Sequence, residues 1–260
     1  MRNHFLRAAT GKVLYDANAL AYINAVEAAD GQALETATKN AINAFVVGCK
    51  ADGIWTAIKA SCILAGARTL AGALTPLVGA APTNVGPFTS DKYNRKLGIT
   101  TSSGKSINTN RSATTDPQDN RHIAAYVTSL TTKLIYESPI TSATYANGFT
   151  AMLCGASSPS ATININISST GTYAPAPYVV GLIGGSRSLS TSISYRSNKV
   201  SVLSFGQTSQ APVAALGNYI ACGGGTGNFS QAFYSAGESL DLALLDTRVT
   251  ALITAINAAF

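Results

Sequence analysis

The side chains best able to do chemistry are unevenly placed, and their distribution favours binding over catalysis. From Ser138 to Gly237 the chain contains no Asp and no Glu, and its only charged residues there are Arg187, Arg196 and Lys199. A glycosidase needs two carboxylates flanking the scissile bond, and a Ca²⁺-dependent lectin needs carboxylate oxygens on the metal. We therefore expect this stretch to form a neutral surface for binding or assembly.

One histidine lies close to acidic residues in the sequence. His122 follows Arg121 and comes shortly after Asp116 and Asp119. A general base needs a positioned partner, and the sequence places no nucleophile beside this histidine, which begins a predicted strand. We interpret it as structural or exposed. The step from Asp116 through Pro117 to Asp119 indicates a turn, with weak cation binding as the alternative.

The cysteines and glycines match no known catalytic or metal-binding motif. Cys49, Cys62, Cys154 and Cys222 form no CxxC pair, and the spacing of Cys and His excludes a zinc site. We interpret the cysteines as buried thiols and leave disulfides open. The glycine-rich run from Cys222 to Gly227 lacks the lysine of a phosphate-binding loop, so it indicates a hairpin turn. We predict no catalytic, cofactor-binding or metal-binding residue, and no enzyme.

Aromatic side chains offer one possible binding surface. Tyr173, Tyr178, Tyr195 and Tyr219 lie in or near predicted strands, beside loops rich in Asn and Ser. Aromatic faces stack on sugar rings and amides bond sugar hydroxyls, so these residues could form a shallow glycan site. Ordinary tyrosines of the core and the sheet surface are the alternative. No residue is assigned to glycan binding.

Charge is scarce in this chain of 260 residues. Only 12% of the residues are charged and the net charge is +6, so hydroxyl and amide groups must cover much of the surface. Basic residues cluster only at Lys92, Arg95, Lys96, Lys105, Arg111 and Arg121. We interpret this cluster as a solvated loop face or a contact for an acidic partner, since nucleic-acid binding usually shows a denser basic stripe. The N-terminus lacks a signal-peptide pattern, and charges interrupt the apolar stretch 54–82, so we expect no membrane partner.

Apolar spacing predicts helices in the first quarter of the chain. Asp16 can cap a helix that runs to about Asp30, with Gly31 as its stop. A second helix is expected over residues 32–50 and a third, shorter one over 54–62, with Trp55 as a core anchor. Residues 64–88 are rich in Gly, Ala and Pro, which indicates an irregular connection.

From about Tyr93 the apolar period changes from 3.6 to 2. Short strands are predicted at 123–128, 149–154, 162–167, 178–183, 192–196, 200–205, 219–222 and 231–235. In residues 163–167 Ile and Asn alternate strictly, which predicts isoleucines facing inward and amides facing outward. Short strands and turns at this spacing indicate an antiparallel β-sandwich. Ser239 is a plausible N-cap for a final helix.

These elements give a fold that is mainly β with helices. We expect an extended N-terminal arm at residues 1–15 and a helical segment at 16–75 packed on the sandwich. The β-sandwich itself spans 76–260 and is closed by the C-terminal helix 240–257. The apolar stripe of that helix could cover the open side of the sandwich or pack against the N-terminal helices.

Three runs carry a resemblance to a known family. The run from Phe233 to Leu240, with the helix that follows it, resembles the end of concanavalin-like (laminin-G-like) β-sandwiches. The runs 40–55 and 93–96 are similar to a version found in virion proteins of tailed bacteriophages. The resemblance covers residues 14–260 and implies a jelly-roll or concanavalin-like sandwich. The metal-binding carboxylates of the family have no counterpart between residues 138 and 237.

The resemblance implies a phage structural protein with one of two roles. The first is a capsid cement (decoration) protein on the outer capsid surface of the virion, a homotrimer that binds the major capsid protein through residues 1–15 and sandwich loops. We expect this role because the chain shows no long coiled-coil or β-helical shaft. The alternative is a tail-fibre or tailspike tip that binds host-surface polysaccharide. A polysaccharide lyase or hydrolase is the third hypothesis. No nucleic-acid partner is expected.

Overall fold

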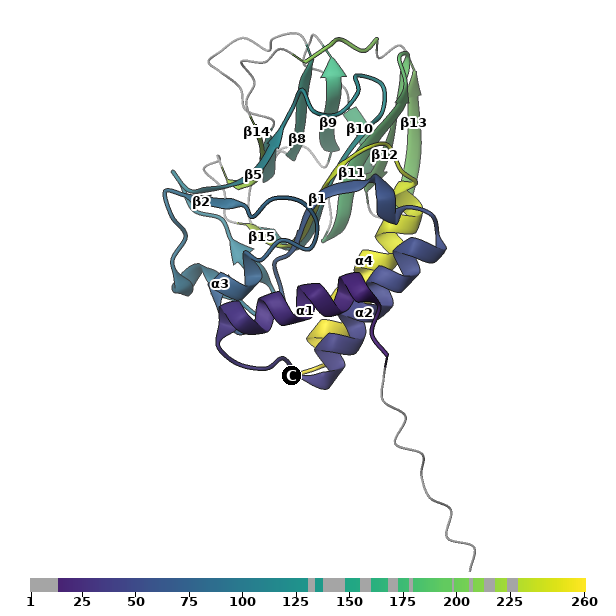
Figure 1. Ribbon diagram of the computed structural model, residues 1–260. Helices are drawn as coiled ribbons and strands as arrows, with labels where there is room; N and C mark the ends of the chain where they lie inside the picture. Colours follow the sequence, from purple (N-terminus) through teal and green to yellow (C-terminus); the bar gives the residue numbers. More distant parts are fainter. Residues whose placement is uncertain are drawn as a thin grey trace, which may run out of the picture.

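The architecture comes from a computed structural model of the chain (Figure 1). It describes residues 14–130, 134–137, 148–154, 160–167, 173–177, 180–197, 199–205, 208–212, 218–223 and 229–260. The predicted arm at 1–15 lies outside these ranges except for its last two residues, and so do residues 224–227 of the predicted glycine-rich turn.

The first two helices confirm the sequence prediction. Helix α1 (Ala17–Asp30) begins where the Asp16 carboxylate accepts a hydrogen bond from the backbone N–H of Asn18, and it ends at Gly31. Helix α2 (Thr36–Ala51) buries one apolar stripe that includes Ile42, Phe45 and Cys49. Both stripes face the same layer of core, because apolar residues three and four positions apart share one face of a helix.

The predicted third helix is wrong. A single 3₁₀ turn (η1, Trp55–Ala57) precedes a strand, β1 (Ile58–Ile63), which pairs with β15 at the centre of a sheet. Every residue of this strand except Lys59 is buried, and periodicity cannot distinguish a strand buried on both faces from a buried helix. The connection that follows is largely irregular, as predicted, with a short helix α3 (Leu70–Ala73) and a short strand β2 (Thr83–Val85).

Fifteen strands form two antiparallel sheets within the described residues. The larger, 8-stranded sheet has the order β13 (Val200–Phe205), β12 (Ser192–Ser197), β11 (Gly181–Leu189), β6 (Arg121–Leu130), β15 (Phe229–Gly237), β4 (Gly98–Thr100) and β3 (Tyr93–Asn94), with β1 paired to β15 beside this path. The 7-stranded sheet has the order β10 (Tyr173–Pro177), β9 (Ser160–Ile167), β8 (Phe149–Cys154), β7 (Leu134–Glu137), β14 (Asn218–Gly223), β5 (Ser106–Ser112) and β2.

Most predicted strands are present, with shifted ends. The strand predicted at 178–183 is instead β11, which begins at Gly181 and runs to Leu189. Residues 178 and 179 lie outside the described ranges. The prediction missed β1 to β5, β7 and β10, which are mostly short or rich in Asn, Ser, Thr or Pro.

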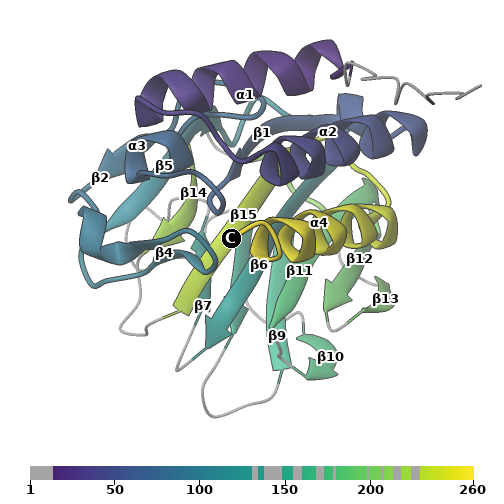
Figure 2. The ribbon, with the colours of Figure 1, turned by 90° about the horizontal axis from the view of Figure 1, so that it is seen from below.

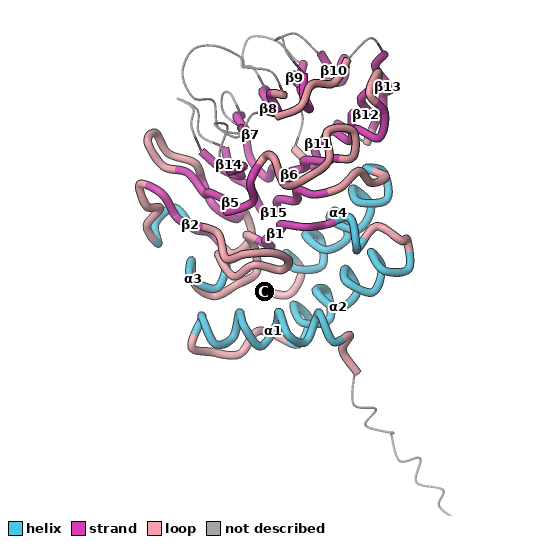
Figure 3. The backbone as a smooth tube through the Cα atoms, turned by 45° about the horizontal axis from the view of Figure 1, so that its top comes forward, coloured by secondary structure: helices cyan, strands magenta, loops and turns pink. Residues whose placement is uncertain are grey.

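Two layers of core hold the fold together. The first lies between the sheets and includes Ile99, Ile123, Ile163, Ile183 and Phe229. The second lies between the outer face of the 8-stranded sheet and the helices (Figure 2). The tube view shows the order of layers: helices, 8-stranded sheet, then 7-stranded sheet (Figure 3). The antiparallel β-sandwich with N-terminal helices and a C-terminal helix is therefore the observed fold.

The C-terminal helix α4 (Leu242–Asn257) both covers the sandwich and packs against an N-terminal helix, the two possibilities that its sequence left open. Its stripe is fully buried and packs on the 8-stranded sheet and against α2. Ser239 is not its N-cap. The cap is Asp241, whose carboxylate accepts hydrogen bonds from the backbone N–H groups of Ala243 and Leu244, while the Ser239 hydroxyl donates to Asn120.

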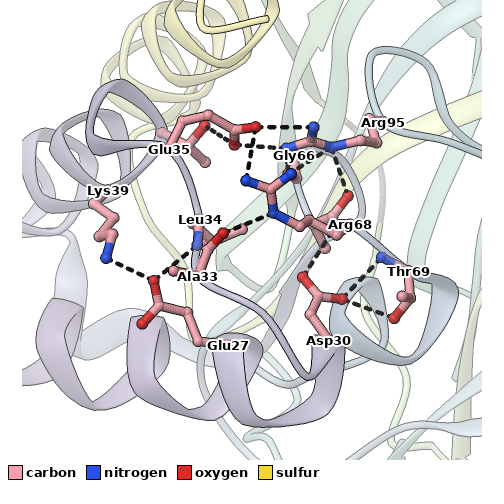
Figure 4. Close-up of polar contacts among 12 residues, drawn as sticks. Glu27, Asp30, Ala33, Leu34, Glu35, Lys39, Gly66, Arg68, Thr69 and Arg95 are labelled. Carbon is pink, nitrogen blue, oxygen red and sulfur yellow. Dashed lines mark hydrogen bonds and ion pairs between the residues drawn. The ribbon is translucent and has the colours of Figure 1, made fainter.

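The basic cluster predicted as one loop face is dispersed by folding. The Arg95 guanidinium bonds both oxygens of Glu35 and the carbonyl of Gly66, and so clasps the α1–α2 corner to the end of β1 (Figure 4). Arg68 pairs with the same carboxylate, and these arginines hold the pKa of Glu35 below its usual range. Arg111 pairs with Asp116. Arg95, which belongs to the run 93–96 that carries the family resemblance, therefore has a structural role.

Two arginines lie inside the sandwich. Arg121 and Arg187 are each 0% exposed. The Arg121 guanidinium donates to the side-chain oxygen of Asn166, 2.6 Å away, and to the carbonyls of Ala113 and Asp116. Asn164 and Asn166 are also 0% exposed, so the outward-facing amides predicted from the alternating sequence are wrong. Asn166 has φ +53, which breaks the alternation at this end of β9.

Candidate functional site

A groove lies between α4 and the outer face of the 8-stranded sheet. It begins as a cavity of about 480 Å³ under the first turn of α4. Five serine hydroxyls line it, from β11, β12, β13 and the β15–α4 linker: Ser186, Ser188, Ser194, Ser201 and Ser239. Asp241 and Ala243 line the helix side. We call this cavity the serine groove.

Strand register brings the serines together. Ser186 of β11 lies opposite Ser194 of β12, and Arg196 of β12 lies opposite Ser201 of β13. Side chains two positions apart share one face of a strand, so these residues and Ser188 all face α4. The sequence carried a signal for this, because Ser occupies every second position from 186 to 194. Such a period of 2 places the hydroxyls on one face of a strand.

Some of these hydroxyls are engaged by the protein. Ser186 accepts a hydrogen bond from the backbone N–H of Leu240 at 3.1 Å, and Ser201 accepts one from Arg196 at 2.9 Å. Ser188 and Ser194 are exposed in the groove. A hydroxyl both donates and accepts hydrogen bonds, so the groove can bond a neutral polar ligand from several directions.

A buried ion pair continues the floor of the groove along α4. Arg196 Nε lies 2.9 Å from Asp246 Oδ2, with the two side chains 13% and 5% exposed. Thr250 donates to the other oxygen of Asp246. Smaller cavities of about 350 Å³ and 200 Å³ follow this pair, lined in part by Lys199 and Thr250. Because the two charges neutralise each other, the groove stays close to neutral.

The tyrosines considered for glycan binding do not gather around the groove. Tyr195 is 1% exposed and belongs to the core between the sheets. Tyr173 and Tyr219 lie in β10 and β14, on the other sheet. Tyr178 lies outside the described residues. The structure therefore places the candidate binding groups on Ser side chains instead.

Sequence reasoning missed a serine–histidine pair. Nε2 of His122 lies 2.7 Å from Oγ of Ser235, and Nδ1 faces the backbone carbonyl of Glu238 at 2.5 Å. Both side chains are 0% exposed. A carbonyl only accepts, so Nδ1 carries the proton and Nε2 accepts from the serine hydroxyl. Cross-strand pairing brings the two residues together from positions far apart in the sequence. The pair anchors the β15–α4 linker and is closed to substrate.

This buried histidine predicts acid sensitivity. Burial lowers the pKa of His122 from 6.5 to about 4, against smaller opposing effects of the Glu238 carbonyl and Asp116. Between pH 6.5 and 4 the unfolded chain binds a proton that the folded chain excludes, so stability falls as the pH falls. Full loss across this window is about 3 kcal/mol. Denaturant titrations at a series of pH values measure it.

The matched variant for this prediction is His122→Asn. Its amide can still donate to the Glu238 carbonyl but does not titrate. We expect it to be less stable than the wild type at pH 7, with a shallower loss of stability between pH 6.5 and 4. Equal pH slopes for the two proteins would contradict the assignment.

The cysteines behave as the sequence predicted where the structure describes them. Cys49 and Cys62 are buried free thiols, and burial raises the pKa of each to about 12. The side chains of Cys154 and Cys222 lie outside the described atoms. In the described part of the chain, no three His, Cys, Asp or Glu residues group as metal ligands. Its helices are too short or too polar to cross a bilayer.

Comparisons with known proteins give only weak matches. No protein-family model and no curated protein matches this sequence. Similar solved structures include a GH54 α-L-arabinofuranosidase soaked with a cyclic sulfate inhibitor, with a TM-score of 0.40 and 12% identity. Another is an arabinofuranosidase complexed with arabinofuranosyl-α-1,2-xylobiose, with a TM-score of 0.37 and 11% identity. Each match covers 60% of this chain and 40% of the other chain. At this level the likeness carries no argument about function.

Proposed function

We propose that this chain is a structural protein of a tailed-bacteriophage virion, a capsid cement (decoration) protein that binds the major capsid protein on the outer shell. The observation that carries the binding role is the use of its carboxylates. Ten of the chain's 12 are held by ion pairs or backbone N–H groups: Asp16, Glu27, Asp30, Glu35, Asp52, Asp91, Asp116, Glu238, Asp241 and Asp246.

These contacts support assembly over hydrolysis. A carboxylate that is ion-paired or that caps a helix is already engaged by the protein in this structure. What the groove offers instead is neutral hydroxyl groups beside Leu240 and Leu242. The buried centres of protein interfaces are depleted in charged residues. A low-charge sandwich with such a face suits a lasting contact with another protein.

The experiment mixes the purified chain with undecorated shells assembled from the major capsid protein of the same genome. Sedimented shells are then assayed for bound chain. We expect binding that saturates at a fixed ratio to the capsid protein, and a homotrimer in the unbound fraction, as the family resemblance implies. A chain that stays in the supernatant at saturating concentration would remove the cement role.

The serine groove favours one second candidate, a tail-fibre or tailspike role in host recognition. Several hydroxyls around a concave, neutral surface match the alternating donors and acceptors of a polysaccharide. A glycan array probed with the wild type and with Ser194→Trp tests this role. We expect signals that the variant loses, because the indole fills the groove. Binding that is equal in both proteins would place any glycan elsewhere.

A further inference from the structure

Among the described residues, β13 is the one edge strand that lacks a feature known to prevent pairing with another strand. Natural sheets protect their edges with short strands, prolines, charges or covering segments. At the other edges, β3 has two residues, β2 has three, and β10 contains Pro175 and Pro177. The free side of β1 is bonded to Leu77 and Val78. Strand β13 pairs only with β12 and runs for six residues at the end of the sheet away from α3 (Figure 2).

The sequence of β13 is suited to pairing with another strand. It reads Val-Ser-Val-Leu-Ser-Phe, with no charge, no proline and no glycine. Short segments of high β-propensity and low charge are the ones that pair between chains. Val200 and Leu203 are 49% and 51% exposed. Ser201 and Leu203 lie on the face toward α4, and Val200 lies on the opposite face, so apolar groups are exposed on both sides.

We propose that β13 pairs antiparallel with β13 of a second copy of this chain, about a two-fold axis at Val202. Pairing identical strands requires an even register, so that facing residues lie on the same side of the sheet. An axis at Val202 sets Val202 against its own copy and Ser201 against Leu203. The contact is self-complementary, as a two-fold interface must be.

Charge favours a second copy as the occupant. The nearest charge along the strand is Lys199, three positions from the axis. The two copies of Lys199 would be six positions apart, about 20 Å at the usual rise of a strand. That separation exceeds the screening length of about 8 Å at physiological salt. No like charges therefore meet in the paired edge, and the 8-stranded sheet becomes continuous across two chains.

The pairing also places two serine grooves on one face. The groove uses Ser201 of β13 and the α4 side of the sheet, and a two-fold axis perpendicular to the sheet keeps that side common to both copies. A two-fold contact is separate from any three-fold contact. The inference does not depend on the proposed function.

Sedimentation velocity over a concentration series tests the pairing, with Leu203→Lys as the variant and Leu20→Lys as its control. Leu20 is 43% exposed on α1. In the paired edge the two introduced lysines are diagonal neighbours on the same face, about 7–8 Å apart at the backbone. We expect the wild type and the control to associate alike. The Leu203→Lys dissociation constant should rise at least about tenfold, since edge lysines oppose strand pairing.

Cysteine cross-linking tests the register in the same full-length chain. Facing positions in an antiparallel pair have Cα atoms about 4.5–5.5 Å apart, within disulfide range. Under mild oxidation Val202→Cys should form cross-linked pairs on a non-reducing gel, and Ser201→Cys and the wild type should form far fewer.

Three results would overturn the inference: a wild-type chain that is monomeric throughout, association that is unchanged by Leu203→Lys, or a trimer without the Val202→Cys cross-link. A chain that binds shells but never pairs through β13 would overturn this inference and support the proposed function. A chain that pairs through β13 but does not bind shells would support this inference and overturn the proposed function.

Discussion

Replacing Arg121 by leucine is expected to lower the free energy of unfolding by about 2–4 kcal/mol, because buried acceptor oxygens lose a charged donor. The guanidinium lies between the sheets and bonds Asn166 and the carbonyls of Ala113 and Asp116. The Asn166 oxygen keeps the hydroxyl of Thr150 as a donor. The two carbonyl oxygens lose the guanidinium as a donor, and an unsatisfied buried acceptor costs more than the bond itself gave. Denaturant unfolding followed by tryptophan fluorescence measures the change.

A lysine variant separates the contribution of the positive charge at position 121 from that of the planar guanidinium group. Arg121→Lys keeps the charge but has a single ammonium in place of a planar fork. It cannot reach three oxygens at once, so we expect it to recover only part of the loss. Replacing a whole buried ion pair by apolar residues can be neutral or stabilising, but here the partners remain. A leucine variant as stable as the wild type would show that the network contributes nothing.

Alanine at Gly98 is expected to cost about 3 kcal/mol or more, because two separate penalties add. Gly98 has φ +84, a left-handed backbone that costs about 1 kcal/mol or more for other residues. A Cβ there would lie 2.0 Å from the carbonyl oxygen of Gln231, in the neighbouring strand β15. Backbone cannot move aside as a flexible side chain does, so β4 must shift away from β15, and overpacking of this kind costs about 1–3 kcal/mol.

Gly104 is the matched control for this prediction. It has φ +75, and nothing lies within 4 Å of the position of its Cβ. Gly104→Ala therefore carries the backbone penalty alone, about 1 kcal/mol. The difference between the two variants in denaturant midpoint isolates the close approach of β4 to β15. Equal losses of stability in the two variants would mean that the close approach of β4 to β15 does not restrict the residue at position 98.

The sequence predicted a helix or strand correctly where a single local pattern, such as a cap residue or an apolar period, was sufficient. The helix cap at Asp16, the apolar stripe of α4 and the bounds of β8 and β13 are as expected. The prediction of a third helix failed because the core between the sheets covers one face of β1 and the helical layer covers the other, while β15 pairs along its edge. Its apolar run then carries no period. Ser239 failed as a cap because Asn120, distant in sequence, engages its hydroxyl.

The functional groups were harder to predict because their contacts are long-range. No local pattern places Ser235 beside His122, since strand pairing alone sets that distance. Tyr195 lies two positions from Ile193 on β12, and both side chains are buried in the core between the sheets. The serine groove needs the register of three strands and the position of α4, although the alternation of serines already indicated a hydroxyl-bearing face.

Composition and periodicity by themselves determined the fold class, the neutral character of the long stretch without carboxylates, and the helices at both ends. These properties follow from local spacing and from which residue types are present. The tertiary structure alone decided that Arg121 and Arg187 are internal, that His122 is neutral and closed off, and that β13 is an open edge. Burial and strand order depend on contacts between residues far apart in the chain, which no local pattern encodes.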